Sequence, residues 1–280
     1  MLIVLGVASV LGLLIGLGAL RLHLVTDALA DVRAYYDAGA RLNAGLPLYE
    51  QAATTDDAAF YRYPPLLAIL FRPLALLPFE TAALIWEAIL VAVTVMTLAR
   101  LRPRRVVLLA AGMLAMPLLW TLAIGQAQAL VTALLAVGSP WAVAFAGHIK
   151  LTPWLVGIYW AGRRDWRSLG LLTWWIVGLA LVQLVLEPQN TIAFLTFSSL
   201  EQVGDVVNLS PFAVSPLLWV ATVAVLGLVA WRLAPTRWGW AAAVVLSVGV
   251  TPRLLAYQLS TLLAALGGPR DAERPSTSGR

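Results

Sequence analysis

The chain has 280 residues, 61% of them hydrophobic and 12% charged, and its mean hydropathy is +0.85. Apolar runs of about 20 residues recur along its length, a pattern that excludes a soluble domain and predicts an all-α, polytopic membrane protein. We expect about eight to ten membrane helices, including short or broken ones, in a single domain over residues 1–266, with a disordered tail at residues 267–280. The sequence has no cysteine and two histidines, which excludes thiolate chemistry and argues against a metal centre or a cofactor bound through one.

The first spanning helix is expected at residues 1–22, and a polar loop over residues 27–64 follows it. This loop holds six of the fourteen carboxylates of the chain: Asp27, Asp31, Asp37, Glu50, Asp56 and Asp57. A membrane protein that gathers acids, tyrosines and turn residues in one loop is predicted to do its chemistry there.

An amphipathic helix is expected over residues 27–43, capped at its start by Thr26 or Asp27. Asp31 is predicted to lie on the side that packs against the rest of the protein, away from any neighbouring cation of its own helix. A carboxylate in such a place is energetically unfavourable unless it has a function there, so Asp31 is a functional candidate. The alternative is a structural ion pair with a distant arginine. The opposite face carries a charged row that is predicted to pair: Arg33, Asp37 and Arg41.

Further along the chain, full crossings are expected at residues 79–101, 106–124, 168–186 and 215–233. Shorter segments with internal breaks are expected at residues 66–78, 126–162 and 238–266. The net charge of +5 is attributed to arginine-rich loops that the positive-inside rule places in the cytoplasm, and it does not indicate nucleic-acid binding. These loops are residues 100–105, 163–167 and 232–237. The first loop and a second one at residues 188–213 are then expected outside.

Two cations stand within the predicted helix breaks. Lys150, the single lysine, lies in the break of the segment 126–162, and Arg253 follows Thr251 and Pro252 in the last segment. Broken helices at membrane depth are tolerated only where they line a cavity, and a cation there is a functional candidate. The alternative for Lys150 is an anchor whose ammonium group reaches the membrane surface.

Several short motifs share one order along the chain: DVRAYYDA from Asp31, GLPLY from Gly45, YPPL from Tyr63, PLALLP from Pro73, GQ at Gly125, AGHIKLTP from Ala146, and TPR from Thr251 with Tyr257. Together they resemble glycosyltransferase family 87, the GT-C-type, polyprenyl-phosphate-mannose-dependent mannosyltransferases of bacteria. The resemblance implies a GT-C-like fold, in a shortened member of the family, and a multi-pass protein of the bacterial plasma membrane with its active site outside.

The resemblance also implies a reaction. A hexose, in the first place mannose, would move with inversion from a polyprenyl-phosphate donor to a glycolipid or glycan acceptor, without metal or cofactor. Asp31 would be the general base. The donor phosphate would be bound by three cations: Lys150, Arg253 and Arg62. The substrate would be contacted by four further side chains: Tyr35, Tyr63, Gln126 and Tyr257.

Two other functions remain open at this point. A transporter or flippase of lipid-linked sugars would share the broken helices and buried cations, although its inverted repeats are not seen in the sequence. A non-catalytic relative would keep the fold and lose the transfer reaction. Only the enzyme requires Asp31 in an external helix.

Overall fold

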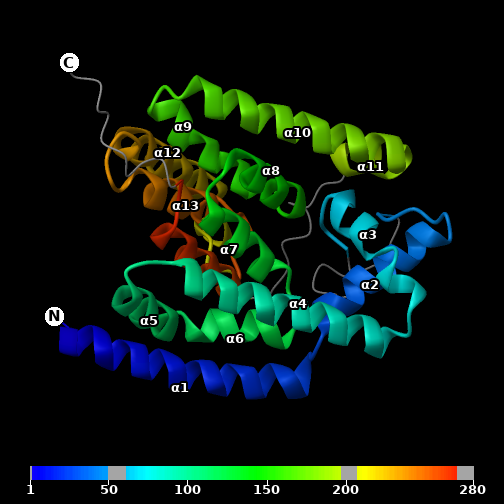
Figure 1. Cartoon of the computed structure of the whole chain (residues 1–280), viewed down its shortest axis with the longest axis horizontal. Helices are drawn as coiled ribbons and strands as arrows, with labels where there is room; N and C mark the ends of the chain where they lie inside the picture. The colour runs from blue at the N-terminus through cyan, green and yellow to red at the C-terminus, as the bar shows by residue number, and fades with distance from the viewer. Residues whose placement is uncertain (1, 50–60, 197–206, 270–280) are drawn as a thin grey trace.

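The computed structural model describes residues 2–49, 61–196 and 207–269 (Figure 1). All regular structure in these ranges is helical, so the prediction of an all-α protein is confirmed. The predictions that concern Glu50, Asp56, Asp57 and most of the C-terminal tail fall outside the described residues.

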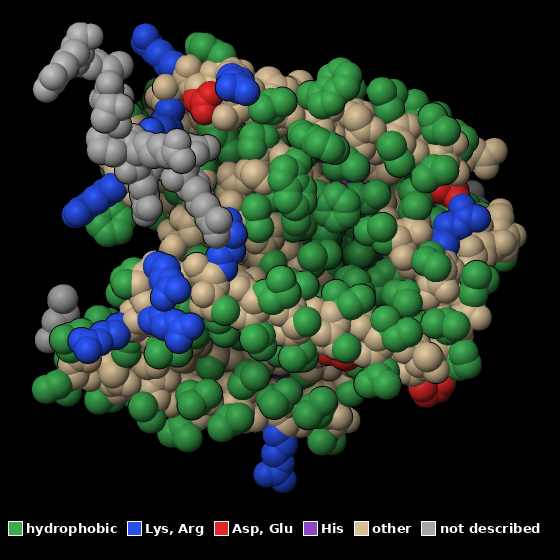
Figure 2. All heavy atoms as spheres, viewed as in Figure 1, with side chains coloured by type: hydrophobic (Ala, Val, Ile, Leu, Met, Phe, Trp, Pro, Cys, Tyr) green, Lys and Arg blue, Asp and Glu red, His purple; other side chains and the backbone are tan. Residues whose placement is uncertain are grey.

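Four helices are long and apolar enough to cross a membrane: α1 (Leu2–Thr26), α4 (Phe79–Arg100), α10 (Trp166–Leu186) and α12 (Pro216–Leu233). Between 6% and 28% of their most apolar windows is buried inside the protein, so most of their hydrophobic surface faces outward. Figure 2 shows the same property as hydrophobic side chains spread over the visible face. A surface of this kind is stable in lipid and not in water, as the composition predicts.

The crossing predicted at residues 106–124 is bent, which the sequence analysis did not anticipate. Residues 104–123 form two helices whose axes differ by 67°: α5 (Arg104–Met113) and α6 (Ala115–Ala123). Pro117 has no N–H group for the carbonyl of Met113, and its ring crowds the preceding turn, so the helix breaks there. The bend packs closely on α1, because a Cβ atom at Gly16 would lie 2.7 Å from the α6 backbone.

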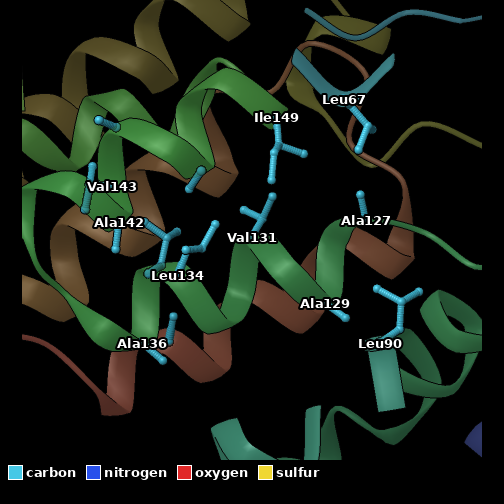
Figure 3. Close-up of a cluster of buried hydrophobic side chains, with 14 of the residues drawn as sticks. Leu67, Leu90, Ala127, Ala129, Val131, Leu134, Ala136, Ala142, Val143 and Ile149 are labelled. Atoms are coloured by element: carbon cyan, nitrogen blue, oxygen red, sulfur yellow. The ribbon is translucent and has the colours of Figure 1, made fainter. Parts of the chain in front are cut away.

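The predicted breaks in the shorter segments are confirmed. The segment after Gly125 is divided into α7 (Gln128–Val137), α8 (Pro140–Ile149), η2 (Thr152–Gly157) and α9 (Ile158–Gly162), and the last segment into α13 (Gly239–Gly249) and η4 (Ala256–Leu266). These short helices form the interior, where small and branched side chains of α7 and α8 meet in the core (Figure 3). With the bent pair counted as one span, the described residues hold up to five spans by length and composition, and three shorter apolar helices bring the number of apolar segments to eight, the lower end of the predicted range.

The polar helix of the first loop, α2 (Ala30–Asn43), is present but starts later than predicted. Its N-cap is Leu29, in the left-handed region at φ 58°, and neither Thr26 nor Asp27 caps it. The backbone N–H groups of Leu29 and Asp31 instead donate to the carbonyls of Ala123 and Ile124, at 3.1 and 3.0 Å. The open C-terminal carbonyls of α6 therefore satisfy the first donors of α2.

The predicted pairs on the outer face of α2 form no salt bridge among the described residues, although the charge of Arg33 still acts on Asp37. The Arg33 guanidinium lies over the Phe79 ring, 3.7 Å from its centroid, and Arg41 donates to the Pro47 carbonyl at 2.9 Å. The salt bridges found among the described residues do not include Asp37. A planar guanidinium gains more from an aromatic face or a fixed carbonyl than from an exposed carboxylate.

The two ends of the bundle differ in structure. At one end lie α2, α3 (Pro65–Phe71), η1 (Leu74–Leu76) and α11 (Pro188–Thr196), and the loops that join α4 to α5, α9 to α10 and α12 to α13 gather at the other (Figure 1). The two predicted external loops contact each other, since Leu48 N–H donates to Asn190 Oδ1 at 2.9 Å, and next to them Arg72 pairs with Glu187 at 3.0 Å. We call the end with α2 the Asp31 end and the other the basic end.

Candidate active site

Asp31 lies in the first turn of α2, on the side that the sequence predicted to face inward. Val32, Tyr35, Ala38 and Leu42, which share this side, are all buried. Burial raises the pKa of the Asp31 carboxyl above its ordinary value, while the charges of Lys150 and Arg62 lower it again. The carboxylate is thus held between a desolvating surface and two cations from distant parts of the chain.

A chain of hydrogen bonds leads from the core to Asp31. Tyr35 donates to Gln126 Oε1 at 2.6 Å, and Gln126 Nε2 donates to the Tyr63 hydroxyl at 3.0 Å. Tyr63 can then donate its own proton to Asp31 Oδ1, at 3.5 Å. Since Tyr35 and Gln126 have no exposed surface and bond to protein groups, they hold Tyr63 in place rather than reaching out from the site. Their predicted contact with substrate stays a prediction.

Lys150 reaches the same site because its helix ends there. The backbone leaves α8 at Lys150 in an extended conformation, with φ −143° and ψ 122°. The ammonium nitrogen lies 5.5 Å from the centroid of the Tyr63 ring and 5.0 Å from that of the Tyr257 ring. Two aromatic faces therefore hold the cation beside Asp31.

Arg62 and Arg253 complete the cluster. Burial is the main cause that lowers the pKa of Arg62, and the positive charge of Arg253 lowers it further, so the two guanidinium groups act on each other. Lys150 and Arg62 both act on the Asp31 carboxyl, and Arg253 joins the cluster through Arg62. Like charges repel strongly away from bulk water, and such an arrangement is stabilised when a further anion binds.

Asn208, in the second loop, fixes the break that presents Arg253. Its Nδ2 donates to the Pro252 carbonyl at 2.8 Å, and its Oδ1 accepts from Leu254 N–H at 2.9 Å. Both backbone bonds flank Arg253 in the chain. The sequence analysis did not identify this residue as part of the site, because its only signal was an amide in a polar loop.

Gln183 and His148, which were not predicted as part of the site, join the segments that carry Lys150 and Tyr63. Gln183 Nε2 donates to His148 Nδ1 at 2.7 Å, and His148 Nε2 in turn donates to the Ile176 carbonyl at 3.0 Å. Gln183 Oε1 accepts from Leu66 N–H at 2.9 Å. The amide thus ties α10 to the end of α8 and to the start of α3.

Gly125 explains why the Gly-Gln motif sits next to α2. Its φ of +70° is unfavourable for other residues, and a Cβ atom there would collide with the side chain of Val32. Its carbonyl accepts from Trp86 Nε1 at 2.8 Å. This tight turn brings Gln126 under Tyr63.

The structure brings all eight residues predicted for the site to the Asp31 end: Asp31, Tyr35, Arg62, Tyr63, Gln126, Lys150, Arg253 and Tyr257. They come from α2, the loop before α3, the α6–α7 turn, the two helix breaks that carry Lys150 and Arg253, and the start of η4. Over residues 2–49, 61–196 and 207–269, no three histidine or carboxylate side chains are grouped so that they could hold a metal ion. The charged and hydroxyl groups brought together at this end are Asp31, three cations and the tyrosines, and the charge of Asp27 acts on Asp31 as well.

Comparison with known proteins gives two matches. The family model described as "Glycosyltransferase family 87" matches residues 60–267. A curated relative from Mycolicibacterium smegmatis, "Polyprenol-phosphate-mannose-dependent alpha-(1-2)-phosphatidylinositol pentamannoside mannosyltransferase", is 34% identical over 158 residues, which cover 49% of this chain and 38% of that protein. No solved structure matches. Asp31 lies outside the stretch that the family model covers.

Proposed function

The chain belongs to glycosyltransferase family 87 and is a membrane glycosyltransferase, and on this basis we propose that it transfers mannose from a polyprenyl-phosphate donor. The name of the Mycolicibacterium relative supports this donor. Because the chain spans 38% of that relative, the acceptor is proposed only by class, as a glycolipid or glycan on the outer face.

In the proposed reaction Asp31 is the general base. An acceptor hydroxyl gives its proton to the carboxylate while its oxygen forms a bond to the anomeric carbon of the donor. The bond between that carbon and the phosphate oxygen breaks on the opposite side, so the configuration inverts. Tyr63, which points its hydroxyl at Asp31 Oδ1, orients the carboxylate for this proton transfer.

The cations receive the leaving group. As the bond to the sugar breaks, the polyprenyl phosphate gains negative charge, and fixed positive groups lower the energy of that transition state. Lys150 and Arg62 act on the Asp31 carboxylate and Arg253 acts on Arg62, so cations from three separate segments converge in one cluster. This convergence is the observation that carries the proposal, because one carboxylate does not require three cations for a structural ion pair.

A transfer assay with the purified protein tests the proposal. Polyprenyl-phosphate mannose with a radioactive sugar is the donor, and a panel of glycolipids supplies the acceptors, with the product measured after extraction. We expect labelled product from at least one acceptor, and about 10²–10⁴-fold less of it from the D31N variant. Donor binding is measured separately on D31N, since this variant should bind the lipid normally. A D31N variant that transfers sugar like the parent would exclude Asp31 as the base.

The alternative of a flippase predicts a different result. A flippase would move the labelled lipid between leaflets without forming a new glycosidic bond. Reconstitution in vesicles, with the same labelled donor, separates the two activities. The structure favours the enzyme, since a transported lipid phosphate has no use for a carboxylate among the cations that bind it.

A further inference from the structure

A second site lies at the basic end, far from Asp31. A cavity of about 370 Å³ opens there, within the range of about 300–1,000 Å³ that small-molecule sites occupy. Its lining includes charged, hydroxyl and aromatic side chains: Arg100, Arg163, Asp165, Ser139, Trp141 and Trp160. The proposed transfer reaction makes no use of these residues.

The charge of the cavity favours an anion. Arg100 ends α4 and Arg163 follows α9, and both line the cavity. The Arg163 guanidinium is held 5.2 Å from the Tyr159 ring centroid and donates to the Ala234 carbonyl at 3.4 Å. Asp165, the carboxylate in the lining, already accepts from Ser168 N–H at 3.1 Å as the N-cap of α10.

A buried hydroxyl and a helix start add further donors. The Oγ atom of Ser139 is buried beside the cavity and has no hydrogen-bond partner among the described residues. Ser139 is the N-cap of α8 but its side chain does not cap the helix, so the first N–H groups of α8 after Pro140 keep their donor capacity. A helix N-terminus with its partial positive charge stabilises phosphate groups.

The position of the cavity identifies the source of the anion. It lies at the end of span α4 and at the start of span α10, which is the depth of lipid head groups. Trp141 and Trp166 are 46% and 64% exposed there, as is typical of the aromatic belt at a membrane surface. Arginine side chains cluster along this end of the molecule (Figure 2). Basic pockets between membrane helices at this depth fit the head groups of anionic lipids.

We propose that this cavity binds the phosphate group of an anionic phospholipid from the leaflet at the basic end. Arg100 and Arg163 contact the phosphate oxygens. The first free N–H groups of α8 and the Ser139 hydroxyl donate hydrogen bonds to the same oxygens. Trp141 lies beside the glycerol and the first carbons of the acyl chains. The lipid is a structural ligand, so its binding does not depend on the transfer reaction.

Lipid binding is measured by native mass spectrometry and by thermal unfolding of the full chain in neutral detergent. The probes are phosphatidylglycerol, phosphatidylcholine and inorganic phosphate. We expect phosphatidylglycerol to stay bound and to raise the unfolding temperature, and the other two to do neither. Loss of one charge-assisted contact weakens binding about tenfold, so the R100Q and R163Q variants should each lose most of the effect.

The matched control is the pair R104Q and R105Q, which removes arginines of the same basic end that do not line the cavity. Its lipid effect should equal that of the parent, and R100K should keep most of it. An equal loss in R104Q and R105Q would show general surface attraction and overturn the site. An equal effect of inorganic phosphate would overturn the assignment to lipid. R163Q also loses the hydrogen bond to the Ala234 carbonyl. If this variant unfolds without lipid for that reason, R100Q alone decides the test.

Discussion

The two ends of this bundle carry positive charge in opposite ways. At the basic end the arginines of the α4–α5 loop are neighbours in sequence, and residues 102, 104 and 105 are all exposed. At the Asp31 end the cations come from residues 62, 150 and 253, are partly buried, and form one cluster that includes Asp31. Charges that are adjacent in sequence serve topology and the membrane surface, whereas charges brought together from distant segments at a cost in desolvation indicate chemistry.

The difference between the ends predicts opposite accessibility across the membrane. Since the chain has no cysteine, single cysteines can be introduced at Leu46, which is 48% exposed at the Asp31 end, and at Arg102 in the basic end. An impermeant maleimide on intact cells should label L46C and leave R102C unlabelled until the cells are permeabilised. The reverse pattern would place the active site in the cytoplasm.

The largest effect on activity is expected at Asp31. Asparagine keeps the size and hydrogen bonds of the side chain but is not an effective base, so D31N should reduce transfer about 10²–10⁴-fold. The control is D37N, on the same helix, because Asp37 makes no salt bridge in the described structure and is half-buried at the outer face. Its transfer rate should stay close to that of the parent. If D37N is the inactive variant, the assignment of the catalytic face of α2 is wrong.

Removal of a cation at the Asp31 end should have the next largest effect. K150M and R253Q each take away a group that stabilises the leaving phosphate, which commonly costs about 10²–10³-fold in turnover. R105Q, which removes one positive charge at the basic end, should change turnover little. Steady-state kinetics of purified variants give the comparison. Parental turnover in both K150M and R253Q would contradict the role of the cations.

The pH dependence of transfer should show the raised pKa of Asp31. The base must be deprotonated, so activity falls as the pH drops towards that pKa, and it falls at a higher pH than for an ordinary carboxyl with a pKa of about 4. Lys150 lowers the pKa of Asp31, so its removal raises that pKa. The acidic limb of the kcat/KM profile should therefore move to higher pH in K150M. An unchanged limb would separate Lys150 from the titrating group.

Sequence reasoning found the reactive groups and missed the residues that support them. Charged side chains are unfavourable on a buried helix face or in a helix break at membrane depth. Asp31 lies on such a face and Lys150 and Arg253 lie in such breaks, and these exceptions can be recognised from the sequence alone. The bend at Leu114 had a signal, Pro117, that the apolar run concealed. Asn208 and Gln183 had no signal beyond the amide itself, because their partners are backbone groups and the His148 ring in distant segments. Pairing of that kind depends on the tertiary fold alone.

Gln183 therefore gives the sharpest test of how the Asp31 end is held together. In Q183L the Leu66 N–H and His148 Nδ1 lose their buried partner, and an unsatisfied buried group costs about 1–3 kcal/mol. The unfolding temperature should fall by a few degrees, and the KM for the donor should rise more than kcat falls, because the segments that carry Lys150 and Tyr63 shift together. T173V, on the exposed face of the same helix, removes only a bond to the Leu169 carbonyl and should be neutral. Q183E, which keeps the acceptor for Leu66, should recover part of the stability; a Q183L variant with parental stability and KM would show that this amide does not position the site.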